Sequence, residues 1–128
     1  GQGGDGALTV ITMLAELLRM NGLNGYTERD VLSRIRGGHA AATMRAFAGD
    51  RYCIGSNINL LVALDEEAVE KNARHIDSKS IVVYDDSGGP VPSVLPQGTK
   101  VYSAPFNRIA MRTMRRELYK NSIAFGVV

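Results

Sequence analysis

The apolar run at residues 58–64 is the feature that most restricts the fold of this chain. It is short and nearly continuous, which is typical of a strand buried on both faces of a sheet. The run passes directly into Asp65-Glu66-Glu67. Aspartate is a favoured helix N-cap, and acidic residues are favoured in the first turn of a helix. The pattern therefore predicts a buried strand and then a helix over 68–76, in which two charge pairs have the supportive i,i+4 spacing: Glu67–Lys71 and Glu70–Arg74.

Helical and strand-like segments alternate along the rest of the chain. Apolar residues at helical spacing predict a helix over 7–20, which Asn21-Gly22 ends, and further helices are expected over 109–119 and from residue 121 onwards. Short apolar or alternating segments predict strands over 39–47, 81–84 and 101–104, a strand or loop over 24–28, and a long loop over 85–98 that is a candidate lid or partner contact.

This alternation predicts an α/β fold with three layers, a largely parallel sheet flanked by helices, of Rossmann-like type. In such sheets ligands bind beyond the carboxyl ends of the strands. On this chain those positions are residues 1–6, 64–65 and 84–86.

Residues 1–6, Gly1-Gln2-Gly3-Gly4-Asp5-Gly6, form a glycine turn that opens directly into the first predicted helix. Glycine lets backbone N–H groups approach a ligand closely, and a helix N-terminus adds unpaired donors and a partial positive charge. Together these features favour an anion-binding site, most often for phosphate. The glycines also match G-x-G-x-x-G, with Glu28 at the distance of a ribose-binding acid, so a dinucleotide site is an alternative.

Residues 33–39, Ser33-Arg34-Ile35-Arg36-Gly37-Gly38-His39, are the expected partner of the glycine turn. Arginine offers two parallel N–H donors that match the oxygens of phosphate or carboxylate. The two glycines have no side chains that would block a ligand beside them. His39 is either an acid–base group or a structural residue at a strand start. The candidate phosphate contacts are therefore Gly1, Gly3, Gly4, Gly6, Ser33, Arg34, Arg36, Gly37, Gly38 and His39.

The cofactors and partners that this chain can hold alone are restricted by its composition. It has one cysteine, Cys53, so neither an internal disulfide nor an iron–sulfur cluster is expected from this chain by itself, and a reducing cytoplasm fits. A net charge of +2 gives no general field for nucleic acid, and no apolar run approaches the ~20 residues of a membrane helix. We therefore expect no catalytic group, no metal site, no nucleic-acid partner and no membrane partner.

Gly4-Asp5-Gly6 has the form that begins the magnesium motif of thiamine diphosphate enzymes. The asparagine that completes this motif should lie roughly a helix and a strand further on. Asn21 and Asn24 come too early for that role. Binding of thiamine diphosphate by this chain alone is therefore not expected.

The chain of 128 residues is expected to be one domain, and a fragment of something longer. In strand–turn–helix units a glycine turn follows a buried strand, but no strand precedes Gly1. Residues 121–128 resemble a helix cut off early. A sheet left incomplete in this way has unpaired edges, so neighbouring parts of a parent protein are expected to cover it.

Five segments of the chain, taken in order, resemble the gamma domain of 2-oxoacid:ferredoxin oxidoreductases. The segments are Gly1-Gln2-Gly3-Gly4-Asp5-Gly6, Tyr26-Thr27, Ser33-Arg34-Ile35-Arg36-Gly37-Gly38-His39, Leu60-Leu61-Val62-Ala63-Leu64-Asp65-Glu66-Glu67 and Asn121-Ser122-Ile123-Ala124-Phe125-Gly126. Asp30-Val31-Leu32 departs from the family pattern, in which a tyrosine–proline-like sequence leads into Ser33. The resemblance covers nearly the whole chain.

The resemblance implies the oxidative decarboxylation of a 2-oxoacid to an acyl-CoA. Thiamine diphosphate, magnesium and iron–sulfur clusters would belong to other domains, and the electrons would pass to ferredoxin. This chain would serve assembly with the alpha and beta regions, with a delta region as a further candidate, in a cytoplasmic oligomer. It would also help to hold coenzyme A, through the candidate phosphate contacts named above. The alternatives are a stand-alone dinucleotide-binding domain and a purely structural interface module.

Overall fold

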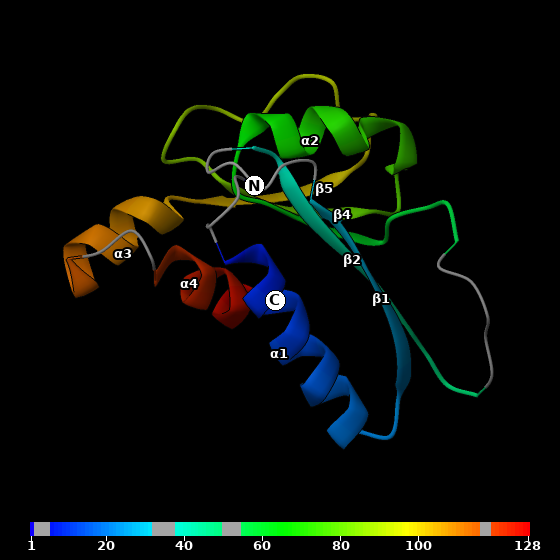
Figure 1. Ribbon diagram of the computed structural model, residues 1–128. Coiled ribbons are helices and arrows are strands. Elements are labelled where there is room, and N and C mark those ends of the chain that lie inside the picture. Colours follow the sequence, from blue (N-terminus) through cyan, green and yellow to red (C-terminus); the bar gives the residue numbers. More distant parts are fainter. Residues whose placement is uncertain (2–5, 32–37, 50–54, 116–118) are drawn as a thin grey trace.

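The structure is a computed structural model that describes residues 1, 6–31, 38–49, 55–115 and 119–128. Its helices are α1 (Ala7–Met20), α2 (Glu66–Asn72), the 3₁₀ turn η1 (Ala73–His75), α3 (Phe106–Met114) and α4 (Lys120–Val127). Its strands are β1 (Asn24–Val31), β2 (Ala40–Phe47), β3 (Leu60–Ala63), β4 (Ile81–Asp85) and β5 (Lys100–Ala104) (Figure 1). The predicted α/β class is confirmed. Within the described ranges, no helix is long and apolar enough to cross a membrane.

Strands β3, β4 and β5 form a parallel sheet with β4 in the centre. Val82, Val83 and Tyr84 of β4 are all buried, as expected for a strand covered on both faces. Val82 and Tyr84 pack in the core on the α2 side, whereas Val83 packs with residues of α3 and α4. The helices therefore lie on both faces of this sheet, which confirms the three-layer arrangement (Figure 1).

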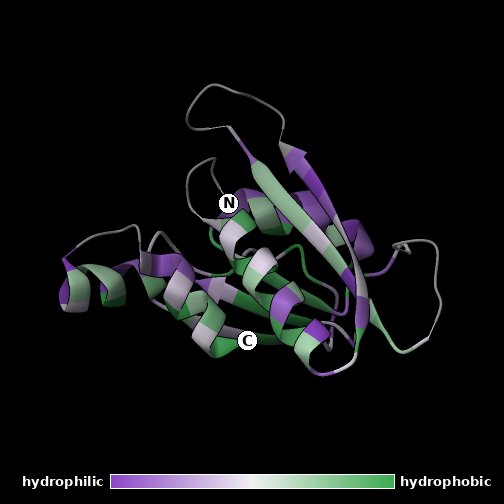
Figure 2. Cartoon of the chain, turned by 60° about the horizontal axis from the view of Figure 1, so that its bottom comes forward, coloured by the Kyte–Doolittle hydropathy of each residue, from purple (hydrophilic) through white to green (hydrophobic). Residues whose placement is uncertain are grey.

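Strands β1 and β2 form a separate antiparallel pair, in which Asn24 lies opposite Phe47 and Val31 opposite Ala40. Helix α1 packs against this pair. Only eight residues, 32–39, separate the two strands in the sequence, which is fewer than the dozen or more that a parallel crossover needs. Strand β1 is largely hydrophilic, whereas β3 and β4 of the parallel sheet are largely hydrophobic (Figure 2). Residues 24–28, expected as a strand or loop, are thus the first part of an exposed strand.

Helix α2 is shorter than the predicted helix because its last turn tightens into η1. The Glu67–Lys71 pair forms as expected, with the ammonium nitrogen 2.7 Å from a carboxylate oxygen. The expected Glu70–Arg74 pair does not form, and Arg74 Nε donates to His75 Nε2 at 3.0 Å instead. A 3₁₀ helix has 3.0 residues per turn rather than 3.6, so the side chain of Arg74 does not lie next to that of Glu70 as it would in an α-helix.

Asp85 joins the end of β4 to the start of α3. Its buried carboxylate accepts hydrogen bonds from the backbone nitrogens of Ser87, at 3.0 Å, and Asn107, at 3.3 Å. Helix α3 consequently starts at Phe106, three residues before the predicted start, and it ends at Met114 because Arg115 has a φ of 56°. In the following loop, Val91 and Leu95 pack against the core on the α2 side.

Candidate functional site

The opening glycine turn and the segment around His39 meet in space, as expected from the sequence. The Gly1 carbonyl accepts a hydrogen bond from the Ala40 nitrogen at 2.8 Å, and the Gly1 nitrogen donates to the Ala40 carbonyl at 3.2 Å. A residue pair that exchanges both bonds in this way is an antiparallel strand pair. Gly38 and His39 are therefore held directly beside Gly1.

The carboxyl end of β3 lies on the other side of Gly1. Asp65 Oδ2 is 3.9 Å from the Gly1 nitrogen, while Asp65 Oδ1 accepts from the Ala68 nitrogen at 2.8 Å and caps α2 as predicted. Leu64 and Ala68 are buried beside it. Gly1 thus lies between the start of β2 and the end of β3, which is the region where parallel sheets bind ligands.

His39 is the polar side chain at this end whose hydrogen bonding is incomplete. It is only 7% exposed, and its Nδ1 is buried without a hydrogen-bond partner among the described residues. An imidazole offers two polar nitrogens, and leaving one of them buried and unpaired costs about 1–3 kcal/mol. The His39 Nδ1 atom is therefore a candidate ligand contact.

The nearby carboxylates are already engaged by side chains of the same helix or by its backbone. The pKa of the Glu67 carboxyl lies below its ordinary value, chiefly because Lys71 donates a hydrogen bond to it, with smaller contributions that include the charge of His39. Asp65 is engaged as the helix cap. Both carboxylates thus already have partners. The polar atom that is left without one among the described residues is His39 Nδ1.

Helix α1 begins at the glycine turn. Gly6 is its N-cap with a φ of +80°, and its carbonyl accepts from the nitrogens of Thr9, at 2.9 Å, and Val10, at 3.1 Å. The first turn carries no acidic residue, so the partial positive charge of this helix end is not neutralised by its own side chains. A Cβ at position 6 would overlap the side chain of Asn121, which comes from α4.

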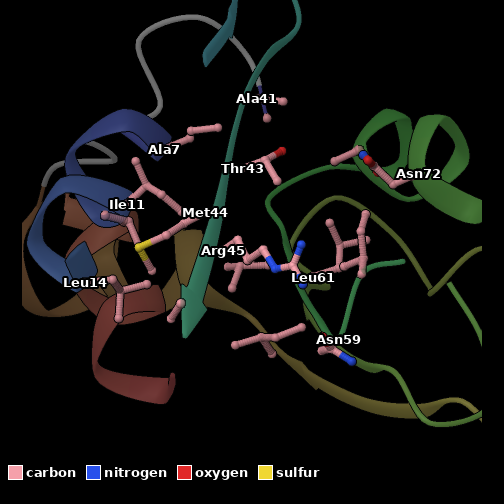
Figure 3. Close-up of a pocket in the computed structure, with 18 of the residues that line it drawn as sticks. Ala7, Ile11, Leu14, Ala41, Thr43, Met44, Arg45, Asn59, Leu61 and Asn72 are labelled. Atoms are coloured by element: carbon pink, nitrogen blue, oxygen red, sulfur yellow. The ribbon is translucent and has the colours of Figure 1, made fainter. Parts of the chain in front are cut away.

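A groove with a volume of about 890 Å³ leads away from this site between β2 and β3. Figure 3 shows Met44 of β2 pointing towards Ile11 and Leu14 of α1, while Thr43 and Arg45 point to the opposite side. Gly1 and His39 lie at one end of the groove, and it continues along β2 to Phe47. Its lining combines apolar residues of α1 and β3 with polar ones that include Thr43, Arg45 and Asn59.

Four of the ten predicted contacts lie within the described residues: Gly1, Gly6, Gly38 and His39. Gly3, Gly4, Ser33, Arg34, Arg36 and Gly37 lie outside them, as does Cys53. Asp65 was expected at this end of the sheet with the glycine turn, although not as a ligand contact, and it is a neighbour of Gly1. Asn121, the neighbour of Gly6, was not predicted as a residue of the site. The signal that could have identified both was their presence in the ordered family segments.

The dinucleotide alternative lacks the structural context that it requires. Glu28 lies within β1, opposite Thr43 in the antiparallel pair. A ribose-binding acid should instead follow a strand parallel to the one before the glycine turn. Metal binding has no evident site in the described ranges, because no group of three or more His, Cys, Asp or Glu side chains gathers there. With a single cysteine, the whole chain also lacks the thiolates that an iron–sulfur cluster needs.

Comparison with known proteins identifies the kind of chain to which this one is similar. A model of the pyruvate ferredoxin/flavodoxin oxidoreductase family matches residues 1–128. No curated protein matches the chain significantly. Among solved structures, a 2-oxoglutarate:ferredoxin oxidoreductase from Magnetococcus marinus, with 2-oxoglutarate, coenzyme A and succinyl-CoA bound, is 31% identical with a TM-score of 0.86. That match covers 97% of this chain but only 22% of the other.

Two further solved structures share the fold at lower identity. The gamma subunit of a keto/oxoacid ferredoxin oxidoreductase from Geobacter sulfurreducens is 20% identical with a TM-score of 0.77. The pyruvate oxidoreductase subunit PORC from Thermotoga maritima is 17% identical with a TM-score of 0.69. In both cases the match covers 98% of this chain and 69% of the other chain.

Proposed function

Because this chain belongs to the pyruvate ferredoxin/flavodoxin oxidoreductase family, we propose that it is the gamma region of a 2-oxoacid:ferredoxin oxidoreductase. The resemblance drawn from the sequence is confirmed at the level of the family. In the proposed reaction a 2-oxoacid loses carbon dioxide, electrons pass to ferredoxin, and the acyl group is joined to the sulfur of coenzyme A. Thiamine diphosphate, magnesium and iron–sulfur clusters are assigned to other regions, since the residues described above do not suit them.

The part of this reaction proposed for the present chain is the binding of coenzyme A. The observation that carries this proposal is the buried His39, whose Nδ1 has no partner in the described part of the chain. It lies beside Gly1 at the carboxyl end of β3, where α/β sheets bind ligands. The positive end of α1 starts from the same glycine turn and favours the phosphates of such a ligand.

The full set of proposed coenzyme A contacts is the set expected from the sequence: Gly1, Gly3, Gly4, Gly6, Ser33, Arg34, Arg36, Gly37, Gly38 and His39. Within it, Arg34 and Arg36 are assigned to phosphate because a guanidinium offers forked donors that match its oxygens. His39 is assigned to a polar group of the ligand that lies nearer the groove.

The second role proposed for this chain is assembly with the alpha and beta regions of the complex. Apolar side chains of α3 and of the edge strand β5 are exposed, namely Ile109, Met111, Met114, Val101 and Tyr102. Strand β5 also has no second neighbour among the described strands. Exposed apolar side chains next to an open sheet edge favour burial against another chain.

The test of the coenzyme A role uses the complete enzyme complex. Substituting Arg36→Glu or His39→Leu should raise the KM for coenzyme A about tenfold or more, since each removes about 1.4 kcal/mol or more of binding. The KM for the 2-oxoacid should not change. Arg74→Glu is the matched charge reversal, because Arg74 lies in η1, away from the site. The position of η1 follows from the bond between the His75 carbonyl and the Ile58 nitrogen, which lies just before the start of β3, whereas the site is at the end of β3. An unchanged KM for coenzyme A in both site variants would refute the role.

A thermal-shift titration of the isolated chain separates the alternatives. A ligand that binds only the folded state raises the melting temperature by mass action. We expect a rise with coenzyme A that exceeds the rise with free phosphate. A rise with NAD or NADP alone would instead favour a dinucleotide-binding domain. No rise with any ligand, together with tight association with the partner subunits, would favour a purely structural module.

A further inference from the structure

The amide side chain of Asn121 lies against the start of helix α1, at the end of the glycine turn. Asn121 belongs to the first turn of α4, and Figure 1 shows α4 beside the first turn of α1. A Cβ at Gly6, the N-cap of α1, would overlap the Asn121 side chain. Glycine at position 6 therefore leaves the space that this amide occupies.

The hydrogen bond that Asn121 makes determines which end of its amide faces Gly6. The Ser122 backbone nitrogen donates to Asn121 Oδ1 at 2.8 Å. Because a backbone nitrogen only donates, the atom that it bonds must be the amide oxygen, and the other atom is the Nδ2 donor. Nδ2 is also the side-chain atom nearest to the Cβ position of Gly6. Asn121 consequently presents an N–H donor to the start of α1.

Helix α1 supplies backbone donors at the same place. The hydrogen bonds to its N-cap carbonyl start from the Thr9 and Val10 nitrogens, so the helix itself gives no partner to the nitrogens of Ala7 and Leu8. Its first turn carries no acidic residue, and no side chain caps it. Side-chain and backbone donors thus lie together at this helix end, which is an arrangement that suits phosphate.

A buried polar side chain gives independent evidence for a ligand at this end of the molecule. His39 is only 7% exposed, and its Nδ1 has no partner among the described residues. His39 lines the same groove as Ala7, the first residue of α1, and Ala124, which lies about one turn after Asn121 in α4. Ala124 is itself fully buried in the core of the parallel sheet, so α4 holds Asn121 in a fixed place.

We propose that Asn121 is a further contact of coenzyme A, and that its Nδ2 donates a hydrogen bond to a phosphate oxygen at the start of α1. The inference rests on the proposed binding of coenzyme A, and it adds α4 to the segments that hold this ligand. A phosphate oxygen only accepts hydrogen bonds, so it matches a group of donors. The neutral amide directs the phosphate without adding charge to the site.

Asn121→Asp separates the donor of this side chain from its structural role. The variant keeps the oxygen that accepts from Ser122, and acidic residues are favoured in the first turn of a helix, so the urea midpoint of the chain should stay the same or rise. The donor is replaced by an anion, so in the complete enzyme complex the KM for coenzyme A should rise about tenfold or more. Asn121→Ala removes the donor without adding charge, and it should raise this KM less.

Pantetheine tests whether the contact is with phosphate, because it carries the thiol of coenzyme A but no phosphate. As the acyl acceptor it should react with the same kcat/KM in the wild type and in Asn121→Asp. The matched control is Asn21→Asp, which makes the same substitution just after the last residue of α1. That position lies about 20 Å from the start of the 14-residue helix, so the KM for coenzyme A should keep its wild-type value.

The outcomes separate this inference from the proposed function on which it rests. A higher KM for coenzyme A in Asn121→Asp, with unchanged reaction of pantetheine, supports the phosphate contact. Equal losses with both acceptors would show that Asn121 acts only through the structure, and the inference would be wrong. If His39→Leu raises the KM for coenzyme A and Asn121→Asp does not, the inference fails while the proposed function stands. If neither variant changes this KM, both are refuted.

Discussion

Replacing Phe106 by alanine should unfold the chain at a much lower urea concentration than replacing Met111 on the same helix. Phe106 is fully buried, and it packs with Leu64, Val83 and Ala124 below the parallel sheet. Removing a buried phenylalanine side chain costs about 3–5 kcal/mol, through lost transfer energy and the cavity left behind. Domains of ordinary size have only about 5–15 kcal/mol of stability, so the loss is a large part of the total. Met111 is 46% exposed, and its substitution by alanine should cost less than about 1 kcal/mol.

The measurement is urea denaturation of the isolated chain, followed by far-ultraviolet circular dichroism because the chain has no tryptophan. The Phe106→Ala midpoint should fall while the slope with urea stays constant, which identifies a loss of stability rather than a change in the unfolded state. Phe106→Leu should recover part of the loss because it restores most of the buried volume. Equal losses for Phe106→Ala and Met111→Ala would refute the view that Phe106 anchors α3 to the sheet.

Two further predictions concern backbone strain and pH. Gly6→Ala and Gly22→Ala both place a side chain at positive φ, 80° and 77°, and each should cost about 1–2 kcal/mol, but only Gly6→Ala also meets Asn121. Urea midpoints should therefore show a larger loss at position 6. Adding Asn121→Ala should reduce the difference, because it removes the two side-chain atoms nearest the added Cβ. No difference between the glycines would contradict the Asn121 contact. The pKa of Asp77 lies below its ordinary value, chiefly because the Lys79 backbone nitrogen donates a hydrogen bond to its carboxylate at 2.8 Å. A lowered pKa means that the ionised carboxylate stabilises the fold at pH values above the unfolded pKa. This stability is lost as the pH falls through the folded pKa. Asp77→Asn should accordingly be less stable than the wild type at pH 7 and equal to it at strongly acid pH, and a constant gap in urea midpoint at both would contradict this assignment.

The elements that follow from local signals were predictable from the sequence. The bounds of α1 were predicted correctly because its apolar spacing is regular and Asn21-Gly22 supplies a stop signal. The capping role of Asp65 is equally local, since it depends on a backbone nitrogen three residues away. The start of α3 was misplaced because the group that fixes it, Asp85, is 22 residues away in the sequence from Asn107. The helix propensity of a short sequence segment contains no information about a contact with a residue so far away in the sequence.

Part of the candidate site followed from the sequence, and part required the three-dimensional arrangement. Pairing of the glycine turn with the segment around His39 was expected and is observed through Gly1 and Ala40. The approach of Asp65 to Gly1 depends on which strand ends beside the turn, and that is a property of topology. Whether the His39 Nδ1 atom has a hydrogen-bond partner depends on all of its neighbours in space, so it could not be predicted from the sequence. The contribution of Arg34 and Arg36, outside the described residues, remains a prediction.

The buried carboxylate of Asp85 gives the molecule a short mechanical connection between its outside and the carboxyl end of its parallel sheet. One oxygen accepts from Asn107 and ties the start of α3 to the last residue of the central strand. The other accepts from Ser87, whose Oγ in turn accepts from the Arg108 nitrogen of α3. Helix α3 also presents exposed apolar side chains at Ile109 and Met114. A subunit that docks on this helix and turns it by even a small angle must strain the bond from Asn107 to Asp85. The displacement would reach the carboxyl end of the sheet through this contact, and it would also act on the core through Phe106 at the start of the same helix.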